Sequence, residues 1–64
     1  MTASRDAIVD ALLAANTAAE CRRALDAAEA WLDDHPDDHD VQMMMEQPAT
    51  ILDLIESNLI PDPG

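Results

Sequence analysis

The sequence has one cysteine, one glycine and no lysine, tyrosine or phenylalanine. With Cys21 alone, an intramolecular disulfide is excluded, and without a glycine-rich segment so is a phosphate-binding loop of the usual kind. The only glycine is Gly64, and no run of alternating β-branched residues occurs, so strands and hairpins are not expected. The sequence therefore predicts an all-α protein, folded as a small three- or four-helix bundle or helical hairpin array.

Basic residues are scarce as well. Three arginines stand against fourteen aspartates and glutamates, which gives a formal net charge of -11. A chain this acidic repels nucleic-acid phosphates and anionic membranes, so we expect neither as a direct partner. A salt-adapted host or one with GC-rich codons would produce a similar composition, so acidity by itself does not establish a docking role.

Long apolar runs are also missing. Asp6 and Asp10 interrupt the short apolar stretch near the N-terminus, unlike a signal peptide, and no segment reaches the roughly 20 apolar residues of a membrane span. We expect a soluble, cytoplasmic protein. Its 64 residues make one small domain with a marginal core, and neither a disulfide nor a closed zinc site is available to support it. The expected support is another protein chain or a second copy.

Helical signals cover most of the chain. Ser4 is a predicted N-cap, and Thr17 with Glu20 forms a predicted capping box just after Asn16, which we expect to end the first helix in the left-handed conformation. Pro36 should stop the second helix. We predict a single helical domain over residues 1–60, an irregular tail over 61–64, and helices at about 4–15, 17–34, 38–47 and 49–58.

Pro48 leaves two alternatives open. It is well placed as the first residue of a fourth helix, because a helix needs no amide hydrogen there. Alternatively, one long helix from Asp38 to Asn58 is kinked at Pro48.

The stretch ALDAAEAWLDDHPDD resembles the second helix of a tetratricopeptide-type repeat. Counting back from Pro36, Leu32, Trp31, Ala28 and Ala24 occupy the places where that family has its apolar residues. The resemblance covers about fifteen residues, and the first-helix pattern Trp-x-x-Leu-Gly-x-x-Tyr is absent. It implies stacked helical hairpins and a role in protein binding.

The acidic stretch 32–47 contains the candidate metal ligands, His35, His39, Asp34 and Asp38. The two histidines are four residues apart, which would place them on one face of a helix, but Pro36 lies between them. The glycine and glutamate of a calcium loop are missing, and three consecutive methionines point about 100° apart. We favour a corner between helices, with no metal or cofactor, over a metal site. At least one of Met43, Met44 and Met45 must point outward, and Trp31 is expected in the core.

These observations favour an interaction module over an enzyme, since four short helices offer no cleft for acid-base chemistry. An apolar face of the third and fourth helices would bind the partner, and the aspartates between the second and third helices would steer a basic surface toward it. The alternative is an acidic mimic of nucleic acid that inhibits a DNA-binding protein. The residues predicted to bind the partner are Asp33, Asp34, Asp37, Asp38, Asp40, Met44, Leu52, Ile55 and Leu59.

Overall fold

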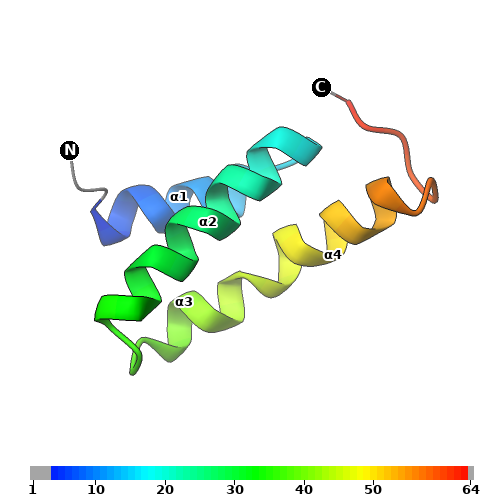
Figure 1. Cartoon of the computed structure of the whole chain (residues 1–64). Coiled ribbons are helices and arrows are strands. Elements are labelled where there is room, and N and C mark those ends of the chain that lie inside the picture. Colours follow the sequence, from blue (N-terminus) through cyan, green and yellow to red (C-terminus); the bar gives the residue numbers. More distant parts are fainter. Residues whose placement is uncertain (1–3, 64) are drawn as a thin grey trace.

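The structure, a computed structural model, describes residues 4–63, which form four α-helices and no strand (Figure 1). The predicted all-α class is confirmed. Residues 1–3, which the predicted domain included, and Gly64 of the predicted tail lie outside the described residues. The helices are α1 (Arg5–Ala14), α2 (Ala18–Asp34), α3 (His39–Met44) and α4 (Glu46–Glu56).

Side-chain caps begin the first two helices, as the sequence indicates. The Ser4 hydroxyl accepts a hydrogen bond from the Ala7 amide at 3.2 Å. At the start of α2, the Thr17 hydroxyl accepts from the Glu20 amide at 3.1 Å, and the Glu20 carboxylate accepts from the Asn16 amide at 3.3 Å. This is a capping box in which the glutamate binds the amide of the residue before the N-cap, and not that of the N-cap itself. It fixes the short turn between α1 and α2.

The expected left-handed residue is found at a different asparagine. Helix α1 ends through an extended Ala15 (φ -65°, ψ 121°), so the prediction for Asn16 was wrong. In the described part of the chain only Asn58 has a positive φ, of 60°. There the Leu59 amide donates to the Leu54 carbonyl at 2.9 Å, and the Asn58 amide donates to the Ile55 carbonyl at 3.1 Å. This pair of bonds is a Schellman motif, which ends α4 and turns the tail away.

The junction between α3 and α4 lies at Met45, and not at Pro48. Pro48 is the third residue of α4 and is buried. Proline has no amide hydrogen, and its ring crowds the carbonyl four residues earlier, which belongs to Met44. The helix therefore breaks upstream of the proline, so both predicted placements of the junction need this correction. Met45 keeps helical angles, and α3 and α4 together form one extended arm (Figure 1).

The core is small and rich in alanine. It contains Ile8 and Leu12 of α1 and Val41 of α3, and α2 contributes Cys21, Ala24 and Ala28. The larger residues Leu25 and Leu32 of α2 are only partly buried against this cluster. Small residues occupy the centre because they let neighbouring helices approach closely, which moves the larger side chains to the edges.

No described helix is long and apolar enough to cross a membrane.

Candidate protein interaction surface

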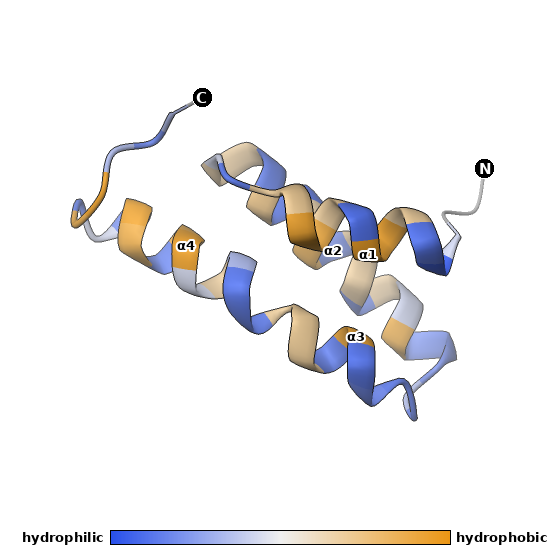
Figure 2. Cartoon of the chain, turned by 180° about the vertical axis from the view of Figure 1, so that it is seen from behind, coloured by the Kyte–Doolittle hydropathy of each residue, from blue (hydrophilic) through white to orange (hydrophobic). Residues whose placement is uncertain are grey.

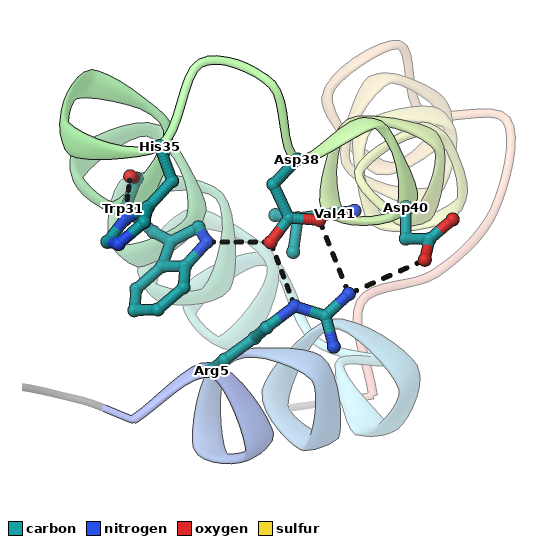
Figure 3. Close-up of polar contacts among 6 residues, drawn as sticks. All are labelled: Arg5, Trp31, His35, Asp38, Asp40 and Val41. Atoms are coloured by element: carbon teal, nitrogen blue, oxygen red, sulfur yellow. Dashed lines mark hydrogen bonds and ion pairs between the residues drawn. The ribbon is translucent and has the colours of Figure 1, made fainter.

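Asp38 joins three helices at the turn between α2 and α3 (Figure 3). Its Oδ2 accepts hydrogen bonds from Arg5 Nε and from Trp31 Nε1, both at 2.8 Å. Its Oδ1 accepts from Arg5 Nη2 and from the Val41 amide, both at 3.3 Å. Asp38 is thus the N-cap of α3 and at the same time connects that helix to α1 and α2.

The hydrogen-bond partners of Asp38 lower the pKa of its carboxyl group. The hydrogen bond from Arg5, followed by that from Trp31, holds the pKa of the Asp38 carboxyl well below its usual range. Conversely, the Asp38 carboxylate raises the pKa of Arg5. The Asp38 side chain is only 14% exposed, and its oxygens are already in use. These contacts favour a structural role for Asp38 over its predicted role in binding a partner.

The other four predicted carboxylates face solvent around this turn, and we call them the acidic corner: Asp33, Asp34, Asp37 and Asp40. Asp40 Oδ2 lies 3.6 Å from Arg5 Nη2, with the Asp40 side chain 77% exposed. Asp33 and Asp34 lie in the last turn of α2, which contains no basic residue to offset the negative end of the helix dipole. No arginine in residues 4–63 pairs with Asp33, Asp34 or Asp37.

The histidines and Trp31 form polar and stacking contacts near the corner. The His35 ring stacks on Trp31 with centroids 3.8 Å apart, and His35 Nδ1 lies 3.1 Å from the Trp31 carbonyl. His39 Nδ1 lies 3.5 Å from Gln42 Oε1. Among the described residues, no three His, Cys, Asp or Glu side chains form a possible metal site. Trp31, predicted in the core, is half-buried against it and directs its indole NH to Asp38.

The apolar residues predicted on α3, α4 and the tail differ in exposure. Met44 and Leu52 pack partly against the core, and Ile55 is half-buried. Leu59 is 71% exposed. Figure 2 shows hydrophobic residues continuing along the C-terminal half of α4 into the following turn. The α3–α4 arm therefore keeps apolar surface that the fold does not cover.

Two further apolar residues belong to this surface but were not predicted individually. Met43 is 69% exposed on α3, and Ile60 is 37% exposed beyond α4. The sequence did indicate that one of the three consecutive methionines faces outward, and the structure identifies Met43. Ile60 carries no pattern of its own, because the direction of the tail depends on the turn at Asn58.

The turn between α2 and α3, which carries the acidic corner, and the C-terminal end of α4 lie at opposite ends of the α3–α4 arm (Figure 1). The arm between them spans residues 39–56, a length of about 27 Å at 1.5 Å per residue. Met43 lies near the corner, three residues after Asp40 on the same helix. Leu59 lies beyond the far end of the arm. A partner that contacts both must extend along the whole arm.

The C-terminal tail returns to the start of α2. The Asp62 carboxylate accepts a hydrogen bond from the Ala18 amide at 3.4 Å, across 44 positions of the chain. The amide belongs to the first turn of α2, where a negative charge is favourable. This contact holds the segment that carries Leu59 and Ile60 at a defined place on the surface.

A second surface feature, a groove of about 370 Å³, lies between α1 and α2. We call it the α1–α2 groove. Residues from α3 and α4 do not line it, and its walls are mostly alanines, with Glu20 and Arg23 at the edge. Sequence reasoning missed this groove, although Ala7, Ala11 and Ala14 recur at helical spacing. Its lining residues are Ala7, Ile8, Ala11, Ala14, Ala15, Glu20, Arg23, Ala24 and Ala27.

The only thiol offers no reactive group to either surface. Cys21 is fully buried, and burial raises its pKa, which keeps it protonated and weakly nucleophilic.

Comparison with protein-family models, with curated proteins and with solved structures finds no match to this chain.

Proposed function

We propose that this protein is an interaction module that binds another protein along its α3–α4 arm. One observation carries the proposal. Helix α4 has four large aliphatic residues, of which none is fully buried, and the only buried residue in this helix is Pro48. These residues are Ile51, Leu52, Leu54 and Ile55. The apolar surface continues into Leu59 and Ile60, which supports a helical or extended partner segment lying along the arm.

The acidic corner gives the proposal its charge preference. Asp33, Asp34 and Asp37 are exposed and form no ion pair with an arginine within residues 4–63, so they are available to a lysine or arginine of a partner. Such charges act mainly on the rate of association, because they attract an oppositely charged surface over distance. The partner that fits best carries an apolar segment with a basic end. The likeness of residues 24–38 to a tetratricopeptide helix is in keeping with a protein-binding role.

A matched pair of leucine substitutions tests the arm. Leu59→Asp should reduce partner binding by at least about tenfold, because it places a charge within the apolar contact. Leu13→Asp is the control: Leu13 is 61% exposed but belongs to α1, which is not part of the arm. Both variants should keep the helical circular dichroism, since neither side chain is buried. The measurement is quantitative capture from a lysate of the source organism, with each variant and the unmodified protein as baits.

Loss of the same partner with both variants, or with neither, would contradict docking through the arm. Asp33→Asn with Asp34→Asn should slow association and weaken its dependence on salt while leaving dissociation nearly unchanged. A DNA-binding protein that is retained by Leu59→Asp but lost with this double variant would instead favour the nucleic-acid mimic.

A further inference from the structure

We propose that the α1–α2 groove is the contact surface between two copies of this chain, which pair around a two-fold axis. The groove is separate from the arm, because none of its lining residues belongs to α3 or α4. Exposed Ala7, Ala11 and Ala14 allow the backbone of a neighbouring helix to come close, at the short end of the usual 8 to 10 Å between helix axes. The occupant that matches the charges at the edge is a second copy.

Charge complementarity identifies this occupant. Glu20 and Arg23 are exposed, lie one helical turn apart on α2, and both line the groove. When the two-fold axis passes beside the midpoint between Glu20 and Arg23, the α2 helices of the two copies are antiparallel. Each Arg23 then faces the Glu20 of the second copy. The same pair forms twice, as an interface between identical surfaces requires.

Arg23 differs from the other two arginines, because each of those lies close to a carboxylate of its own chain. Arg5 pairs with Asp38 and Asp40, and Arg22 lies 3.9 Å from Glu56. Arg23 is the one arginine that forms no ion pair within residues 4–63, despite fourteen acidic residues in the chain. A carboxylate from outside the chain is the partner that this guanidinium lacks.

This arrangement also keeps the most acidic regions apart. Asp33 and Asp34 lie about twelve residues from the proposed axis, or roughly 18 Å along α2. In an antiparallel pair the two acidic corners would be separated by about 36 Å, several times the Debye length of about 8 Å at physiological salt. Each corner and each α3–α4 arm stays free for a partner.

Arg23→Glu tests the contact without changing the capping box. It turns both attractive pairs into repulsive ones, so the dissociation constant of the dimer should rise by about tenfold or more. Arg22→Glu is the control, because it makes the same change in charge at the neighbouring residue, outside the groove lining. It also removes the exposed contact with Glu56, a loss that should have little effect on the fold. Sedimentation equilibrium at physiological salt, up to roughly millimolar protein, gives the mass of each, and circular dichroism confirms the helices.

A charge exchange makes the test specific. Glu20→Arg also removes the carboxylate of the capping box, so its helical circular dichroism is recorded first. Alone it should weaken the dimer, whereas an equal mixture of Glu20→Arg and Arg23→Glu chains should form a mixed dimer. In that mixture every facing pair is again of opposite charge. A monomeric unmodified protein at all concentrations, an unchanged Arg23→Glu dimer, or a mixture of two fully helical variants that stays monomeric would each overturn the proposal. Weakening of the dimer by Arg22→Glu to the same extent would also overturn it.

Discussion

Leu12→Ala is expected to lower the free energy of unfolding by about 2 to 5 kcal/mol. Leu12 is 1% exposed and is among the largest fully buried side chains of the structure. The buried core contains few other large side chains, since four of its seven residues are alanines or Cys21, so a cavity at this position would be filled only in part. A domain of 64 residues has a total stability of only about 3 to 10 kcal/mol. The loss is therefore a large share of the total, and if the stability lies at the lower end of this range, much of the population should be unfolded at room temperature.

The adjacent residue is the matched control. Leu13 has the same side chain on the same helix but is 61% exposed, so Leu13→Ala should change stability by no more than about 0.5 kcal/mol. Urea denaturation followed by helical circular dichroism measures both variants. Equal losses in the two would mean that the buried stripe of α1 is assigned to the wrong residues.

Acid is expected to open the contact at Asp38. The folded protein holds the pKa of this carboxyl below that of an unfolded chain, mainly through Arg5 and then Trp31. The stabilisation is therefore complete above the unfolded value, near 3.9, and is lost as the pH falls from there toward the folded value. The indole NH of Trp31 donates to the same oxygen as Arg5 Nε. Fluorescence of Trp31, the only tryptophan, should report this loss directly.

Asp38→Asn should produce the destabilised state already at neutral pH. The amide can still accept one hydrogen bond as a helix cap, but it has no negative charge for Arg5 and one acceptor fewer. Asp37→Asn is the control, because Asp37 is exposed and its side chain makes no hydrogen bond or ion pair with a described residue. Thermal unfolding should show a lower midpoint for Asp38→Asn alone. The difference between this variant and the unmodified protein should shrink below about pH 4.

A difference that stays constant as the pH falls would show that Asp38 acts only as a cap. Comparing variants is necessary because the other carboxylates also become protonated in acid. Their protonation reduces the self-repulsion of a chain with net charge -11, which acts in the opposite direction on stability.

The helix caps and the fold class could largely be predicted from the sequence. Ser4 and the Thr17–Glu20 capping box act through hydrogen bonds to amides three or four residues away, so their spacing in the sequence is enough. The all-α class follows from helical periodicity in the absence of strand patterns. Pro48 was recognised as a helix breaker, but its effect appears at Met45, because the proline ring acts on the carbonyl of the preceding turn.

The candidate surfaces depended on packing between distant segments. Asp38 looked like one more solvent-facing acid until the fold placed Arg5, 33 positions away, beside it. The α1–α2 groove needs two helices at a close crossing, and the distance between the acidic corner and Leu59 depends on how α3 and α4 align. The sequence by itself determined the helical class, the N-terminal caps of α1 and α2, and the charge. Only the tertiary structure decided which charges are neutralised internally and which apolar side chains stay uncovered, because both outcomes arise from contacts that no local pattern encodes.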